Sequence, residues 1–161
     1  MKTKQLLFLL AFALLIFSCK KNDDYRDAYE GVYNASVIGF INYVNTDLGI
    51  FLTQTIKEQT SIIVRKLSGR ELTISIEGGT MTALVDENGK LTIPSESGTF
   101  TEIDPDTGVP ITTNITVTYS GVITGKTISI EESYSGTASF PESGKTINLN
   151  ISGNVVYSGT K

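Results

Sequence analysis

The side chains that most often carry out catalysis are nearly absent from this chain. Among its 161 residues there is no histidine and no tryptophan, and Cys19 is the only cysteine. Without imidazole, neither a Ser-His-Asp nor a Cys-His centre can be assembled. Zinc and copper sites built on imidazole and thiolate are excluded for the same reason. A lone cysteine also rules out an intrachain disulfide.

Carboxylates are the remaining candidates for acid-base chemistry. A pair about 5–10 Å apart hydrolyses glycosidic bonds. Glu131 and Glu132 are adjacent, so on a strand they point to opposite faces and cannot share a substrate. The pairs Asp86-Glu87 and Asp104/Asp106 lie in turn sequences, where acids usually bond the local backbone. We therefore expect a non-enzymatic protein and keep a carboxylate-based glycan-acting enzyme as an alternative.

Three short segments resemble ligand-binding loops only in part. Asp104 to Gly108 has alternating acids, but Val109 and Ile115 stand where an EF-hand needs glycine and glutamate. The Gly-Lys-Thr triplets at 125–127 and 144–146 lack the earlier glycine of a phosphate-binding loop. We expect no cofactor and no metal site.

The first 19 residues have the pattern of an export signal. Lys2 and Lys4 precede an apolar run from Leu6 to Phe17, and Ser18 then precedes Cys19. As a helix the apolar run is about 18 Å long, shorter than the ~30 Å hydrocarbon core of a bilayer. A short apolar run followed by a small residue is typical of a cleaved signal peptide. We assign residues 1–18 to this signal.

The segment Ile16-Phe17-Ser18-Cys19 resembles the lipobox of bacterial lipoproteins, with Phe17 an unusual occupant of its position. The resemblance implies that the Cys19 thiol carries a diacylglycerol and becomes the mature N-terminus. The polar residues that follow indicate a flexible linker over 19–30. Lys20 to Asp24 also resembles the export signal of Bacteroidota lipoproteins, which implies a lipid anchor in the outer membrane and exposure at the cell surface. A plain solvated linker is the alternative.

The charge of the chain after Ser18 is acidic. Without Lys2 and Lys4, the 13 basic residues become 11 against 17 acids, a net charge of -6. Nucleic-acid partners are disfavoured, because phosphates require clustered lysine and arginine. We expect the membrane contact to be the N-terminal lipid alone.

From Gly31 onward the sequence predicts β-structure. Apolar and polar residues alternate from Leu72 to Glu77, and the segments around Ile115–Ser120 and Ile147–Val155 repeat this pattern. Alternation of this kind is typical of antiparallel sheets with one solvated face. One helical turn is expected before them, over Tyr25–Tyr29, capped by Asp23 or Asp24.

Short turn sequences separate the predicted strands. The strongest is Asn88-Gly89, which predicts a hairpin between Met81–Val85 and Lys90–Ile93. Counting between turns predicts an antiparallel up-and-down meander of eight to nine strands. Closing such a meander removes its two unpaired edges, so we predict a single β-barrel over residues 31–161. A two-sheet β-sandwich is the alternative.

Gly31-Val32-Tyr33 opens the first long predicted strand and resembles the Gly-x-Trp start of lipocalins and other calycins, with Tyr33 in place of tryptophan. This resemblance implies a lipocalin-like barrel. An eight-stranded barrel is wide enough to hold one small ligand, so we expect a binding domain for a small apolar ligand in the barrel mouth or for an envelope component. A structural or interaction protein, such as an inhibitor, immunity factor or accessory subunit, is the alternative.

Aromatic side chains in a β-domain can line a ligand cavity, but most of them fill cores. We assign seven aromatic residues to the core, namely Phe40, Tyr43, Phe51, Phe100, Tyr119, Tyr134 and Phe140.

Overall fold

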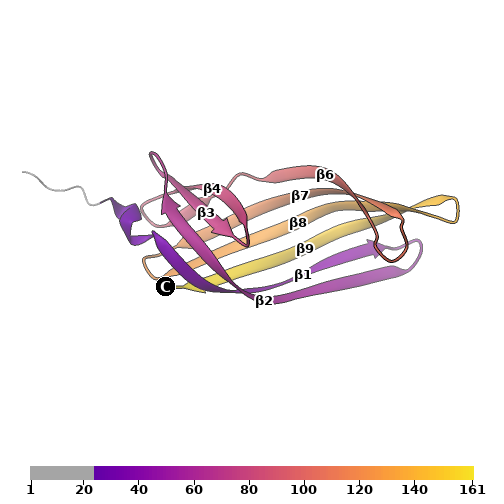
Figure 1. The fold of residues 1–161 in the computed structure, drawn as a ribbon, viewed down its shortest axis with the longest axis horizontal. Coiled ribbons are helices and arrows are strands. Elements are labelled where there is room, and N and C mark those ends of the chain that lie inside the picture. Colours follow the sequence, from indigo (N-terminus) through magenta and orange to yellow (C-terminus); the bar gives the residue numbers. More distant parts are fainter. Residues whose placement is uncertain (1–23) are drawn as a thin grey trace, which may run out of the picture.

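The computed structural model describes residues 24–161, which form one antiparallel sheet preceded by a short helix (Figure 1). The helix is the 3-10 turn η1 (Tyr25–Ala28). The strands are β1 (Gly31–Asn45), β2 (Ile50–Lys66), β3 (Glu71–Ile76), β4 (Gly79–Val85), β5 (Lys90–Thr92), β6 (Glu96–Ile103), β7 (Pro110–Ile123), β8 (Thr127–Glu142) and β9 (Lys145–Thr160). Within these residues, no helix is long and apolar enough to cross a bilayer.

The sheet closes on itself into an eight-stranded barrel. Strands β1 to β5 pair in chain order, and so do β7, β8 and β9. The ring is completed where β9 pairs with β1 and where β5 pairs with β7. The predicted all-β meander and barrel are therefore confirmed, and the sandwich alternative is wrong. The Asn88-Gly89 hairpin joins β4 to β5 as predicted.

β5 and β6 follow one another along the same edge of β7. Leu91 pairs with Gly121, and Glu96 pairs with Val117. Four residues lie between the two paired positions on the β5–β6 side and three on β7, so the β5–β6 side carries a one-residue bulge. Pro94, which has no backbone N–H, lies within it, as is usual for a proline in a sheet. The bulge shifts the inward-facing positions from odd to even residue numbers.

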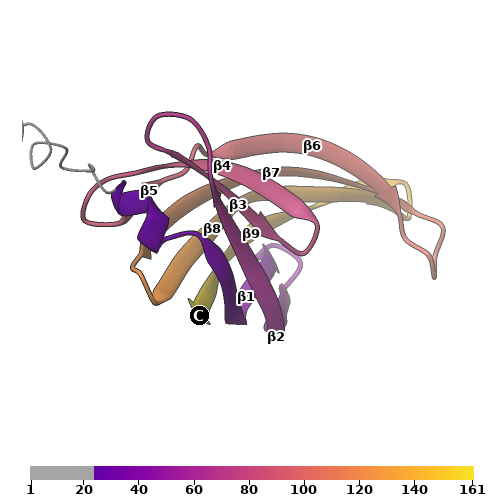
Figure 2. The same ribbon diagram turned by 60° about the vertical axis from the view of Figure 1, so that its left-hand side comes forward.

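The barrel is closed at one end only. β3 and β4 have six and seven residues, whereas β1, β2, β7, β8 and β9 have 14 to 17. Beyond the short hairpin, the long strands and β6 continue as an open, curved sheet (Figures 1 and 2). We call the concave side of this extension the trough. The expectation that closure removes all free edges is wrong, because β2 before Ile62 and β6 each have only one neighbouring strand.

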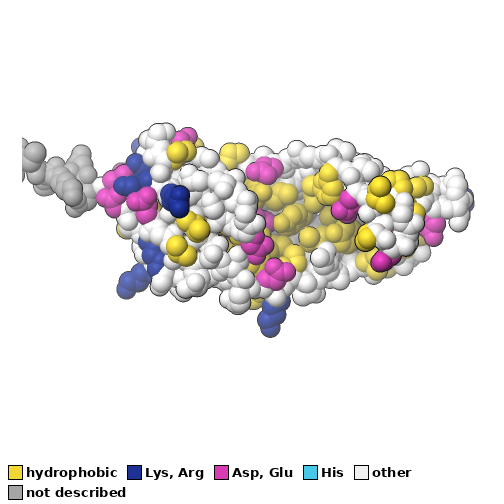
Figure 3. Space-filling view, viewed as in Figure 1, with side chains coloured by type: hydrophobic (Ala, Val, Ile, Leu, Met, Phe, Trp, Pro, Cys, Tyr) yellow, Lys and Arg dark blue, Asp and Glu magenta, His cyan; other side chains and the backbone are white. Residues whose placement is uncertain are grey.

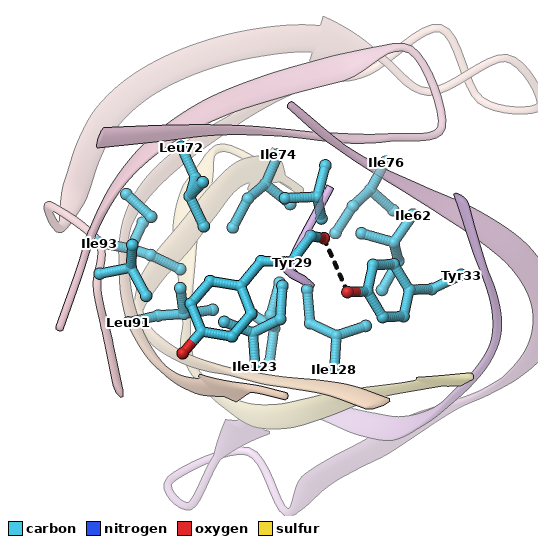
Figure 4. Close-up of a cluster of buried hydrophobic side chains, with 14 of the residues drawn as sticks. Tyr29, Tyr33, Ile62, Leu72, Ile74, Ile76, Leu91, Ile93, Ile123 and Ile128 are labelled. Carbon is cyan, nitrogen blue, oxygen red and sulfur yellow. Dashed lines mark hydrogen bonds between the residues drawn. The ribbon is translucent and has the colours of Figure 1, made fainter. Parts of the chain in front are cut away.

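Side chains fill the interior of the closed part. Inward positions on the short strands, such as Leu72 and Ile74, meet those of β7 and β8, such as Ile123 and Ile128 (Figure 4). These four side chains have no more than 2% of their surface exposed. The alternation read from the sequence thus produces a solid core, and a ligand site has to be sought elsewhere.

The helix η1 covers the closed end of the barrel. Tyr29 is buried in the core, and its carbonyl accepts a hydrogen bond of 2.7 Å from the Tyr33 hydroxyl (Figure 4). The Tyr25 hydroxyl donates to the Val85 carbonyl at 2.9 Å. The predicted helical turn is therefore present, and it belongs to the barrel. η1 falls within the segment 19–30 that the sequence assigns to the linker.

Polar contacts hold η1 in place. The Asp24 side chain accepts a hydrogen bond from the Arg26 backbone N–H and pairs with the Arg26 guanidinium at 2.7 Å. These hydrogen bonds lower the pKa of Asp24 to about 2. Lys66 at the end of β2 pairs with Asp27. At the other end of the chain, the Lys161 ammonium lies 5.0 Å from the centre of the Tyr33 ring, a cation–π contact.

Three glycines mark the border between the closed part and the trough. Gly39, Gly153 and Gly136 lie on the adjacent strands β1, β9 and β8, each two residues further along the sheet than the one before. A Cβ at any of them would lie 2.1–2.4 Å from a backbone oxygen of the neighbouring strand. Such close approach is possible only for glycine, and it permits the sharp sheet curvature found here.

The described residues supply their own packing. Within the described residues, one buried cluster fills the barrel and a second lies on the trough floor. The first and last strands of the segment pair with each other. Because residues 24–161 contain the closed barrel, its core and the pairing of their first and last strands, we expect this segment to fold on its own.

Candidate functional site

The trough contains a groove of about 780 Å³ whose floor is apolar. Its deepest residues, on β8 and β9, are the buried side chains of Ala138, Leu149 and Ile151. Figure 3 shows hydrophobic side chains gathered in this hollow, with acidic side chains around it. Because the hollow lies outside the solid core, it is the part of the molecule best suited to take up a ligand.

Strand periodicity places the groove residues. Every second residue of a strand faces the same side of the sheet. The inward positions therefore continue from the barrel core into the trough, as in Ile128 and Ile130 followed by Ala138 and Phe140 on β8. The other apolar contributors from β1, β2 and β7 are Ile41, Tyr43, Ile50, Leu52, Ile111 and Ile115.

The β6 edge and the β6–β7 loop form one wall of the groove. Phe100 and Glu102 contribute from β6, and Asp104, Thr107 and Val109 contribute from the loop. The Asp104 carboxylate accepts hydrogen bonds from the Thr107 backbone N–H at 2.8 Å and from the Thr107 hydroxyl at 2.9 Å. These bonds lower the pKa of Asp104. Asp104 thus fixes the loop that borders the groove, which agrees with the turn role expected for this acid.

The charged residues that line the groove are all acidic. They are Glu102, Asp104 and Glu142, and no lysine or arginine is among its lining residues in the described chain. Glu102 and Glu142 are solvent-exposed, whereas the floor below them is buried. The groove is therefore apolar at its base and negative at its rim.

A buried carboxylate lies between the barrel core and the trough. Glu132 is only 7% exposed, and its carboxylate accepts hydrogen bonds from the Tyr134 hydroxyl and, at 3.3 Å, from the Tyr157 hydroxyl. Burial raises the pKa of Glu132, and the two hydrogen bonds partly oppose this effect. Burial and the neighbouring carboxylate also raise the pKa of both tyrosines. The cluster keeps its hydroxyl protons, so it is a fixed polar layer across the interior.

The structure places the acids singled out in the sequence as follows. Glu131 is on the outer face and Glu132 on the inner face, so the two do point apart as predicted. The Asp86 carboxylate accepts hydrogen bonds from the backbone N–H groups of Asn88 and Lys90, at 2.9 and 2.8 Å, and stabilises the turn. Cys19 and the signal at 1–18 lie outside the described residues.

The two Gly-Lys-Thr triplets lie in the hairpins that join β7 to β8 and β8 to β9, between strands as expected. Among residues 24–161, no three acidic side chains are grouped closely enough to hold a metal ion.

The assignment of seven aromatic residues to the core is wrong for three of them. Phe40 and Phe51 are 45% and 68% exposed on the outer face, and Phe100 is 49% exposed at the groove wall. Tyr43 and Phe140 are half-buried and line the groove. The other two, Tyr119 and Tyr134, are half-buried at inward positions near Glu132. A count of inward and outward positions from Tyr33 along β1 would have placed Phe40 outside.

Two features of the site were missed. Glu132 occupies an inward position after Ile128 and Ile130, so the alternation alone marked it as a polar residue on an apolar face. The groove had no comparable signal, because its walls come from segments far apart in the sequence.

The architecture defines the class of fold, an all-β antiparallel barrel of lipocalin-like form with an open extension. No protein-family model matches the chain, and no curated protein has a significantly similar sequence. What the protein does must therefore be argued from the groove.

Proposed function

We propose that this protein is a lipid-tethered, non-enzymatic binding protein that takes up an apolar small molecule in the trough. The observation that carries the proposal is the apolar groove of about 780 Å³ at the open end of a barrel whose interior is filled. Ligand sites typically measure about 300–1,000 Å³ and are lined mainly by hydrophobic side chains with few polar groups. The groove has both properties.

The tether fits this arrangement. Lipidation of Cys19 would attach the chain to the outer membrane, with the domain at the cell surface. Four residues lie between Cys19 and Asp24, so the five steps of chain that join them span at most about 18 Å. Asp24 is at the closed end, whereas the groove is at the far end of β8, whose 16 residues extend about 50 Å. The groove would therefore face away from the bilayer.

A pair of substitutions on β1 tests the binding site. Ile41 faces the groove, and Ile38 is 58% exposed on the opposite face of the same strand. We expect residues 24–161 to enhance the fluorescence of the uncharged apolar dye N-phenyl-1-naphthylamine. Ile41→Gln should weaken this binding about fivefold or more, because a polar amide replaces part of the groove wall. Ile38→Gln should leave it unchanged. No binding by the wild-type domain, or equal losses in both variants, would overturn the proposal.

A second candidate function, that of an interaction protein, is favoured by the exposed outer-face residues Phe40 and Phe51. Exposed apolar patches and free strand edges are common partner sites. Capture of a stoichiometric envelope partner that is lost with Phe51→Ser but kept with Leu52→Ser would support this function. The reverse pattern would support the groove, because Leu52 lines it.

A further inference from the structure

The trough carries an excess of negative charge. Its three segments, residues 39–60, 96–117 and 135–153, contain seven acidic and two basic side chains. Neither of the two basic residues, Lys57 and Lys145, lines the groove, although Lys145 is the cross-strand neighbour of Glu142 at the β8–β9 hairpin. An anionic group bound there would have no cationic partner among the lining residues.

The apolar and the acidic side chains of the groove lie at different depths. Ala138 and Leu149 on the floor are less than 10% exposed and apolar, whereas Glu102 and Glu142 are exposed at the rim. A ligand with one apolar chain and one polar end can bury the chain on the floor only if the polar end emerges past these acids. A cationic end would be attracted there, and a carboxylate would be repelled.

We infer that the groove selects a cationic amphiphile, with its alkyl chain on the floor and its ammonium-type group at the Glu102–Glu142 rim. This inference rests on the proposed function and specifies the ligand class. The groove volume of about 780 Å³ accommodates a single-chain molecule of this kind. Free fatty acids, which have the same apolar chain but the opposite charge, are poor ligands.

Three probes with one alkyl chain in common test the inference. Dodecylamine, dodecanol and dodecanoate are titrated, below their aggregation concentrations, against residues 24–161 loaded with N-phenyl-1-naphthylamine. We expect dodecylamine to displace the dye at a concentration about tenfold lower than dodecanoate, with dodecanol between them. In water, a charge about 6 Å away changes affinity by about threefold, in opposite directions for the two charged probes, which gives the roughly tenfold ratio. At about 1 M salt, where the Debye length is about 3 Å, the ratio should approach one.

The outcomes separate the inference from the proposed function. If dodecanoate or dodecanol binds as tightly as dodecylamine, the ligand class is wrong while the groove remains a binding site. If none of the three displaces the dye and the dye itself does not bind, the proposed function fails.

Two double variants locate the charge effect. Glu102→Gln with Glu142→Gln neutralises the rim, and Glu71→Gln with Glu87→Gln makes the same charge change at the closed end. Asp104 is left intact because it holds the loop. We expect the rim variant to lower the ratio of the two displacing concentrations, dodecanoate to dodecylamine, to about threefold or less. The closed-end variant should keep this ratio near tenfold. Equal losses would show that net charge, not the rim, sets the preference, and would overturn the inference. Circular dichroism checks that both variants fold.

Discussion

Two leucines separate the role of the closed barrel from that of the trough. Leu72 on β3 has no exposed surface, and Leu52 on β2 is 57% exposed and lines the groove. Leu72→Ala should cost about 3 kcal/mol of unfolding free energy, since buried leucine-to-alanine changes cost about 2–5 kcal/mol. For a domain of this size that lowers the Tm by about 10 °C. Leu52→Ala should cost less than about 1 kcal/mol, because the side chain is mostly in water already.

Binding should respond in the opposite order. A ligand that covers the exposed part of Leu52 gains about 1 kcal/mol from it, roughly half of the value for full burial. Leu52→Ala should therefore weaken dye binding about fivefold. Leu72→Ala should bind normally at temperatures where it is folded. Urea unfolding followed by circular dichroism, together with dye titration, measures both quantities. Comparable stability losses in the two variants, or a binding loss confined to Leu72→Ala, would refute this division.

Three further predictions concern the polar layer, the bend and the anchor. Burial raises the pKa of Glu132 above its unfolded value, so the stability linked to its protonation is present at low pH and is lost as the pH rises through the raised value. Glu132→Gln should thus raise the Tm more at pH 8 than at pH 4, and an equal effect at both would contradict the burial argument. Gly136→Ala should cost more than about 2 kcal/mol in urea unfolding, because its Cβ would lie 2.1 Å from the Asn114 carbonyl oxygen, whereas Gly98→Ala, with open space around it, should be nearly neutral. In cells given labelled palmitate, the full chain should take up label and Cys19→Ser should not; a serine variant that stays membrane-bound would rule out the lipid tether.

The fold was predictable because local signals agreed with one another. The alternation from Leu72 to Glu77 corresponds to β3, and the Asn88-Gly89 turn produced the expected hairpin. Both depend only on neighbouring residues, which is why a single sequence reveals them. Barrel closure followed from the general cost of free edges.

The trough was not predictable in the same way. It exists because β3 and β4 end after six and seven residues while their neighbours continue. The Glu77-Gly78 turn that ends β3 was not among the turns recognised in the sequence. The one-residue bulge at Pro94 then exchanges the inward-facing and outward-facing side chains of β6. The inward position of Phe100 therefore depends on this bulge. Such shifts move a whole strand's side chains to the other face.

The edges of the trough suggest why an open apolar sheet is tolerated. On the outer face of β6, Ser97 bonds Thr116 at 2.8 Å and Thr101 bonds Thr112 at 3.0 Å, so this edge carries polar pairs. Polar edge residues disfavour pairing with other chains.

The apolar floor has no comparable protection, although covering it with longer β3 and β4 strands would gain about 25 cal/mol per Å². The closed barrel has a buried core of its own, separate from the apolar cluster on the trough floor. A second apolar cluster that faces an open groove bordered by acids supports our proposal that a ligand covers it.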